Sequence, residues 1–161
     1  MWLCRRTMWL YGRTMSPAAD EFVAIQEALV NFVRAFGLHQ PDRTPCGQPM
    51  TASEAHALTE LGRDGPLRQI ALGRRLRLEK STISRLVSLL AERGWLERIP
   101  SSEDGRGVLL SLTDEGRKTA AAITDARFKK FAALLESIPA DRRTDVLAAL
   151  HTLTEALDAQ R

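Results

Sequence analysis

Residues 81–116 read STISRLVSLLAERGWLERIPSSEDGRGVLLSLTDEG, and this stretch decides the fold. Its first part has a helical period, because at about 100° per residue four apolar residues share one side: Ile83, Leu86, Val87 and Leu90. The opposite side carries hydroxyls and a cation: Ser81, Arg85 and Ser88. We therefore predict a helix that packs through one face and presents the other outward.

A short hairpin is predicted directly after this helix. Two β-prone runs, 95–99 and 108–112, flank the polar, glycine-bearing segment PSSEDGRG. A shorter helical pattern over 66–76 precedes the helix, which opens at Glu79 or Lys80 and runs to Gly94. Helix, tight turn, helix and hairpin in this order are typical of a winged helix-turn-helix. The predicted fold class is mainly α with a small β wing.

Two more helices are predicted upstream. Apolar residues recur every three or four positions over 22–36, after a serine and a proline at 16–17 that form a helix start signal. The segment 39–50 contains three prolines and a glycine, so it is predicted to be a loop. Thr51 and Glu54 then have the spacing of a capping box, which indicates the start of the next helix.

Downstream, Thr113 is predicted to cap a long helix that Pro139 ends. The last helix carries an apolar seam with spacings of four and three residues: Val146, Leu150, Leu153 and Leu157. These outer helices offer more apolar surface than the small middle unit can cover. We infer that long dimerisation helices flank the winged helix-turn-helix; the alternative is an intramolecular bundle in a monomer.

The chain is accordingly divided into four parts. They are a poorly ordered N-terminal extension, a first dimerisation helix with its loop, the winged helix-turn-helix and the C-terminal dimerisation helices, over 1–15, 16–50, 51–118 and 119–161 respectively. No apolar run approaches the roughly 18 residues that span a bilayer, and the N-terminus lacks the pattern of a secretory signal. We therefore expect a cytoplasmic protein that does not engage a membrane.

The distribution of charge predicts a polyanionic partner for the middle of the chain. Residues 63–118 carry 12 basic and 8 acidic residues, a net charge of +4, whereas the remainder carries 11 basic and 12 acidic residues, a net charge of −1. A basic middle between neutral or acidic flanks suits nucleic acid, although a solvated mixed surface would have the same composition.

Double-stranded DNA fits the predicted fold, because a major groove admits one α-helix. Hydroxyls can bond phosphates and base edges, and arginine can hold guanine O6 and N7 in a bidentate pair. The predicted DNA-binding residues of the helix are Lys80, Ser81, Thr82, Ser84, Arg85 and Ser88. In the hairpin, Arg106 is the group best suited to the negative potential of the backbone or minor groove.

The same residues resemble the MarR family of bacterial transcriptional regulators. The resemblance is carried by the KST opening of the helix, by ERGWLERIPSSED running into the hairpin, and by LSLTDEG returning to helix. It implies a homodimer that binds pseudo-twofold DNA half-sites, usually as a repressor, with relief by a small ligand or an oxidant. It also implies that Asp104 orients the wing and that Arg106 contacts DNA.

Three positions depart from the family pattern. Gly73 stands where alanine is usual, Arg77 stands where the turn usually has glycine, and Gly105 replaces the first of two wing arginines. A non-glycine residue at this turn is expected to adopt a strained left-handed conformation. In proteins of this kind effectors lodge between the dimer helices and the DNA-binding lobe. Since few fixed charges line that region here, an uncharged or singly anionic aromatic effector is expected.

Other functions are weighed against this one. Cys46 with His39 and His56 could bind zinc, or Cys46 could sense oxidants, but their spacing matches no compact ligand motif. Cys4 and Cys46 give no disulfide framework. A winged-helix module that binds only protein is the rival class. Since no catalytic constellation is present, we predict a binding protein without a cofactor rather than an enzyme.

Overall fold

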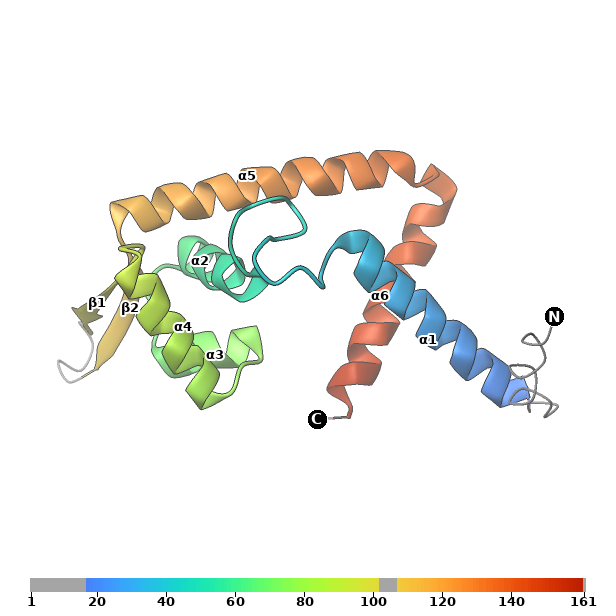
Figure 1. Cartoon of the computed structure of the whole chain (residues 1–161), viewed down its shortest axis with the longest axis horizontal. Helices are drawn as coiled ribbons and strands as arrows, with labels where there is room; N and C mark the ends of the chain where they lie inside the picture. The colour runs from blue at the N-terminus through green and yellow to red at the C-terminus, as the bar shows by residue number, and fades with distance from the viewer. Residues whose placement is uncertain (1–16, 102–106, 161) are drawn as a thin grey trace, which may run out of the picture. The chain divides into compact units, whose positions relative to one another are not determined.

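The computed structural model describes residues 17–101 and 107–160 of the chain (Figure 1). The predicted N-terminal extension and two predicted wing residues, Asp104 and Arg106, lie outside these residues. The chain forms two compact units, of which the first contains α1 and the second begins at Gln40.

The first unit contains one amphipathic helix, α1 (Pro17–Phe36). It ends as the apolar period predicts, because Gly37 adopts a φ of 85° and the amides of Gly37 and Leu38 bond back to the carbonyls of Arg34 and Val33. These two hydrogen bonds form a Schellman motif, which gives the last carbonyls of a helix their hydrogen-bond partners. Phe32 and Phe36 stack with ring centroids 5.5 Å apart.

The second unit has the predicted element order. Its elements are α2 (Ala52–Asp64), α3 (Gln69–Leu76), α4 (Lys80–Glu92), β1 (Leu96–Pro100), β2 (Val108–Leu112), α5 (Asp114–Ser137), a short 3-10 helix (Ala140–Arg142) and α6 (Arg143–Asp158). The two strands pair antiparallel, with Leu96 opposite Leu112 and Pro100 opposite Val108. The predicted fold class, mainly α with a small β wing, is therefore confirmed.

The start of α3 differs from the prediction. Helix was expected from Pro66, but α3 begins at Gln69 because Leu67 is extended and pairs with β2. The Leu67 amide donates to the Leu110 carbonyl at 3.1 Å, and the Leu110 amide donates back at 2.8 Å. The bridge ties the wing to the segment that leads into the helix-turn-helix.

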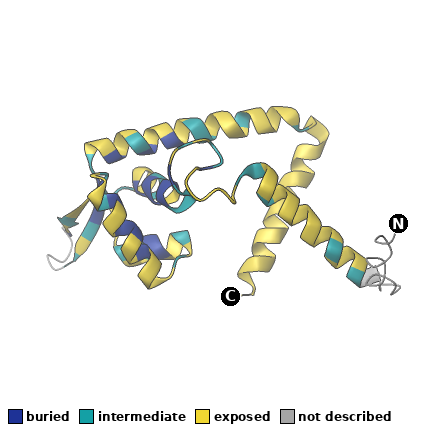
Figure 2. Cartoon of the chain, in the orientation of Figure 1, coloured by how far each residue is buried: buried dark blue, intermediate teal, exposed yellow. Residues whose placement is uncertain are grey.

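The core lies where the helix-turn-helix, the wing and the start of α5 meet (Figure 2). Its largest fully buried apolar residues come from five elements: Leu58, Leu72, Val87, Leu90, Leu110 and Ile123. The four residues predicted to share the packed side of α4 are all buried. The core therefore holds α4 by its buried side, and the opposite side of α4 faces outward.

Much apolar surface remains exposed outside this core. The buried residues of α5 are Gly116, Ala120 and Ile123, all in its first half, whereas Phe128 and Phe131 further along are 73% and 47% exposed. All residues of α6 are exposed, including the predicted apolar seam. In the described part of the chain, no helix has the length and apolar content that crossing a membrane requires.

Candidate nucleic-acid interface

The outward face of α4 presents the side chains that the sequence analysis singled out. All six are exposed: Lys80, Ser81, Thr82, Ser84, Arg85 and Ser88. Within residues 17–101 and 107–160, none of their side chains makes a hydrogen bond or an ion pair. Several other arginines of the second unit form ion pairs with carboxylates: Arg63, Arg75, Arg77, Arg93 and Arg117. The cations of α4 are thus available to an external partner.

The first turn of α4 also suits an anion. Its N-cap residue, Glu79, makes no side-chain capping bond, and the turn contains no acidic residue. The first amides of a helix have no partner inside the helix, and they lie at the positive end of its dipole. Together with Lys80 and the neighbouring hydroxyls, they form a group that can hold a phosphate oxygen.

The turn before α4 has an unusual backbone. Arg77 adopts φ 56° and ψ 37°, and it is the one non-glycine residue with positive φ among those the structure describes. Two backbone hydrogen bonds hold the turn. The Arg77 amide donates to the Arg74 carbonyl at 3.1 Å, and the Leu78 amide donates to the Gly73 carbonyl at 3.0 Å. The predicted left-handed conformation is therefore confirmed.

An ion pair joins this turn to the end of the chain. The Arg77 guanidinium contacts the Asp158 carboxylate twice, from Nη1 to Oδ1 at 2.6 Å and from Nη2 to Oδ2 at 2.7 Å. Asp158 is the last residue of α6. The pair therefore connects the helix-turn-helix to a helix that contributes no residue to the hydrophobic core.

The other end of α4 is fixed to α2. Glu54, which is 1% exposed, accepts a bond from the Thr51 amide through Oε2, and its Oε1 lies 3.2 Å from Arg93 Nη1. The Arg93 guanidinium also lies over the Trp95 ring, 5.1 Å from its centroid. The residue that caps α2 thus also anchors the C-terminal end of α4.

The start of α5 is held tightly against the α4–β1 turn. Thr113 caps the helix by accepting from the Gly116 amide, and its hydroxyl donates to the Gly94 carbonyl at 2.7 Å. A Cβ at Gly116 would lie 1.9 Å from the Trp95 carbonyl oxygen. Only glycine permits this close approach, which joins the start of α5 to the backbone that follows the helix-turn-helix.

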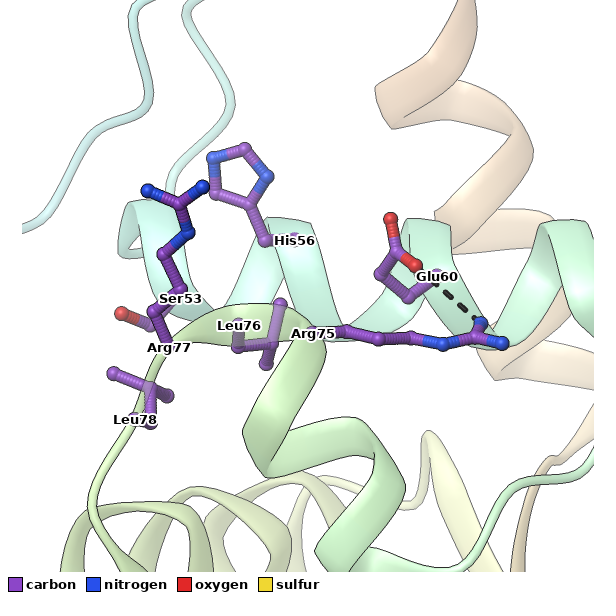
Figure 3. Close-up of a pocket in the computed structure, with 7 residues that line it drawn as sticks. All are labelled: Ser53, His56, Glu60, Arg75, Leu76, Arg77 and Leu78. Carbon is purple, nitrogen blue, oxygen red and sulfur yellow. Dashed lines mark ion pairs between the residues drawn. The ribbon is translucent and has the colours of Figure 1, made fainter. Parts of the chain in front are cut away.

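A cavity of about 210 Å³ opens between α2 and the α3–α4 turn (Figure 3). It is lined by Ser53, His56, Glu60, Arg75, Leu76, Arg77 and Leu78. In Figure 3 the His56 and Arg77 side chains rise on the same side, from α2 and from the turn. The pKa of His56 lies below its ordinary value because partial burial and the charge of Arg127 disfavour the imidazolium, while Glu60 opposes them.

A charge cluster lies beside the cavity at the end of α2. Arg63 Nε donates to Asp64 Oδ1 at 2.9 Å, and this bond is the main reason why the pKa of Asp64 is lowered. Arg75 also bonds Asp64, and it lies 3.5 Å from Glu60 Oε2. Arg75 is therefore held by two carboxylates.

Among the residues that the structure describes, no three His, Cys, Asp or Glu side chains form a group that could share an ion, and none of the zinc candidates His39, Cys46 and His56 belongs to such a group. Cys46 instead lies in the loop before α2, with its sulfur 3.1 Å from the Thr44 hydroxyl.

Two exposed arginines were not among the DNA-binding residues predicted from the sequence. Arg74 on α3 and Arg98 on β1 are exposed and make no ion pair within the described residues. Their charge was the only signal in the sequence, and many other residues share it. Their availability appears only once the paired arginines have been identified.

Comparison with known proteins gives a consistent result. The sequence profile of the MarR family matches residues 48–107. An uncharacterized HTH-type transcriptional regulator of Mycobacterium leprae is 30% identical over 110 residues, which cover 68% of this chain and 77% of that protein.

Two solved structures share the fold. The PcaV transcriptional regulator from Streptomyces coelicolor, in complex with its natural ligand, is 23% identical with a TM-score of 0.66; the match covers 90% of this chain and 99% of that chain. Streptococcus pneumoniae FabT in complex with DNA is 17% identical with a TM-score of 0.64, over 88% of this chain and 96% of that chain.

Proposed function

The chain belongs to the MarR family of transcriptional regulators, and on that premise we propose that it is a homodimeric repressor whose operator is released by a small aromatic effector. Membership makes it a DNA-binding regulator and not an enzyme. The dimer, the repression, the effector and the individual DNA contacts belong to the proposal.

The outward face of α4 carries the proposal. It combines two cations and four hydroxyls that have no partner within the described residues, on a helix fixed from behind by the core. Such a face can bond phosphates through Lys80 and the first turn, and base edges through Arg85. A protein-interaction module would instead need an apolar outer face. FabT, which shares the fold, is known in complex with DNA.

Exposed apolar residues support the dimer. They include Phe22 on α1, Phe128 on α5 and Leu157 on α6, which are 67%, 73% and 56% exposed in the single chain. Apolar residues exposed to this extent mark interaction surfaces. A second copy would cover them with like surfaces and would place two α4 helices to meet successive major grooves, about 34 Å apart.

The regulatory part of the proposal is supported by the PcaV structure, which contains that protein's natural ligand. An effector that binds free dimer more tightly than DNA-bound dimer must weaken DNA binding, because the coupling is reciprocal. The effector class proposed here is a phenol or an aromatic acid.

A salt series on DNA tests the function. Operator duplexes are first selected from random DNA with the full-length protein, and affinity is then measured as salt increases. The logarithm of the affinity should fall linearly with the logarithm of salt concentration, since each neutralised phosphate releases counterions. Failure to select any sequence, or an affinity that does not fall with salt, would refute DNA recognition and favour the protein-interaction module.

The redox alternative has its own test. Cys46→Ser should leave the response of DNA binding to an aromatic acid intact, because Cys46 lies in the loop before α2 and bonds only Thr44 in the described chain. Loss of the response in this variant, with the fold preserved, would replace the aromatic effector by a redox mechanism.

A further inference from the structure

We propose that Arg77 and Asp158 are positioning residues for DNA recognition: their ion pair holds the turn before α4 to the end of α6 and so fixes the orientation of α4. The inference rests on the proposed function for its effect on DNA binding. The attachment of α6 to the turn can itself be measured without DNA.

The backbone of Arg77 gives the first reason. Its left-handed conformation, with φ 56° and ψ 37°, is one that glycine adopts without steric cost and that a residue with a Cβ rarely adopts. The two backbone hydrogen bonds of the turn use the amides of residues 77 and 78, which a glycine at position 77 would also supply. What arginine adds is its guanidinium, and the structure shows this group on Asp158.

The position of Asp158 gives the second reason, because it is one where a helix disfavours a carboxylate. Asp158 is the last residue of α6, at the negative end of the helix dipole, and the last turn of α6 contains no basic residue. The Arg77 guanidinium supplies the cation that this helix end lacks. The pair therefore offsets an unfavourable feature in both segments that it joins.

The pair is also the polar attachment of α6 to the helix-turn-helix. All residues of α6 are exposed in the single chain, and none belongs to the hydrophobic core. Among the residues that the structure describes, no other hydrogen bond or ion pair runs from α6 to α2, α3, α4 or the wing. The two contacts, at 2.6 and 2.7 Å, join the planar fork of Arg77 to both carboxylate oxygens, so they restrict the angle between the partners as well as their distance.

This pair gives the helix-turn-helix a second attachment to the long helices. The first is the start of α5, where Gly116 meets the Trp95 carbonyl and Thr113 bonds Gly94. Those contacts follow the C-terminal end of α4, whereas Arg77 precedes its N-terminal end. Attachments beyond both ends fix the orientation of α4. In the proposed homodimer, this orientation decides whether the two α4 helices meet successive major grooves about 34 Å apart.

The strength of the pair suits it to orienting α4 rather than to holding the fold. Both side chains are 46% exposed, and exposed ion pairs contribute little to the free energy of unfolding. Loss of the pair should therefore leave the protein folded and weaken DNA binding. The expected loss of operator affinity is up to about fivefold for each pair, and a dimer contains two pairs.

Two substitutions with opposite charge changes test the pair. Arg77→Gly removes the guanidinium and gives the left-handed position its preferred residue, and Asp158→Asn removes the carboxylate. Both should weaken binding of the full-length protein to the selected operator by about threefold or more, and the double variant should bind no more weakly than either single variant. A general effect of charge predicts instead that Asp158→Asn binds DNA more tightly. Tighter or unchanged operator binding by Asp158→Asn therefore overturns the proposal.

An exchanged pair and a matched control complete the test on DNA. Arg77→Asp combined with Asp158→Arg should restore affinity, because aspartate tolerates a left-handed backbone. Discrimination against duplexes with one base pair inserted between the half-sites should fall in the single variants and return in the exchanged one. Asp145→Asn removes a carboxylate of the same helix that pairs with Arg142, so it should bind the operator as the wild type does. Additive losses in the double variant, or an equal loss in this control, overturn the proposal.

Hydrogen exchange without DNA separates this proposal from the proposed function. In Arg77→Gly the amides at the end of α6 should exchange faster, although the substitution lies 81 residues from Asp158. Unchanged exchange at the end of α6 overturns the attachment, whatever the protein does to DNA. If exchange is faster but the wild-type protein selects no DNA sequence, the proposed function fails and the attachment stands.

Discussion

The carboxylate of Glu54 and the guanidinium of Arg93 join α2 to the C-terminal end of α4, with 3.2 Å between Oε1 and Nη1. The same carboxylate completes the capping box of α2 through its other oxygen. Within the described residues, Glu54 Oε1 is the buried side-chain polar atom that has no hydrogen bond, so Arg93 is its main compensation. This pair fixes the position of the helix proposed to read DNA.

Arg93→Met should therefore destabilise the protein. The substitution leaves a carboxylate buried without its cation, and it removes the contact with Trp95. Because Arg93 is 39% exposed, we expect a loss of about 1–3 kcal/mol of unfolding free energy, less than for a fully buried pair. Urea unfolding measures it. In the Glu54→Gln background, where the charge is absent but capping is retained, the same change should have a smaller effect, and an equal effect would contradict the pairing.

Two glycine substitutions should have opposite signs. A Cβ at Gly73 would meet Ile83 at 3.4 Å, an ordinary contact, so Gly73→Ala should stabilise α3 by up to about 1 kcal/mol. At Gly116 the Cβ would overlap the Trp95 carbonyl oxygen, so Gly116→Ala should destabilise by about 1–3 kcal/mol or more. Thermal unfolding of the two variants compares them directly, and a stable Gly116→Ala protein would show that α5 is not held at this contact.

Arg85 and Arg106 should contribute differently to DNA binding. Arg85→Ala is expected to lose about 1–3 kcal/mol on the selected operator and to relax base preference, because it removes the bidentate base contact that we propose for this residue. Arg106→Ala should weaken all sequences more evenly and lower the salt slope by about one. Competition between operator and mutated duplexes measures both effects. Equal loss of preference in the two variants would contradict this division.

Stability should fall in mild acid because of His56. Its pKa in the folded protein is below the ordinary value of 6.5, so the unfolded chain takes up this proton more readily. The contribution is fully present above about pH 6.5 and is lost as pH falls through the lower, folded-state pKa. His56→Gln should flatten this part of the stability profile, measured by urea unfolding from neutral to acid pH. Arg127→Gln removes a charge that lowers the pKa of His56, so the loss of stability should end at a higher pH. An unchanged stability profile in both variants would refute the assignment to His56.

The apolar seam of α6 should hold the dimer. Leu150 and Leu153 are 44% and 39% exposed in the single chain, so Leu150→Glu should abolish dimerisation while leaving the core of the lobe folded. Sedimentation velocity gives the oligomeric state and circular dichroism the helical content. Thr152→Glu, on the opposite side of α6, is the matched control and should remain dimeric. A wild-type protein that sediments as a monomer at tens of micromolar would refute the dimer itself.

Local signals predicted most of the helices correctly. The capping box at Thr51 and Glu54 forms as expected, with bonds of 3.2 and 2.7 Å. The apolar period over α4 identified its buried side, and Thr113 caps α5. These features depend on residues three or four positions apart, so the sequence contains all the information that they require.

Contacts between distant segments could not be predicted in this way. Helix was expected from Pro66, but Leu67 pairs with Leu110 and delays the start of α3. The cavity depends on α2 meeting the α3–α4 turn, and the partner of Arg77 lies 81 residues away. The left-handed backbone of Arg77 was expected from the resemblance to a family, whereas its bond to Asp158 required the structure.

The contact of Gly116 with the Trp95 carbonyl gives α5 the properties of a lever. The helix has 24 residues, which at 1.5 Å per residue is about 36 Å, and beyond Gly116 it contains neither glycine nor proline at which to bend. A tilt of about 5° about this contact would displace the far end of α5 by about 3 Å. Conversely, a displacement of a few ångströms imposed on the far end would rotate the whole lobe, and α4 with it, without any rearrangement inside the core.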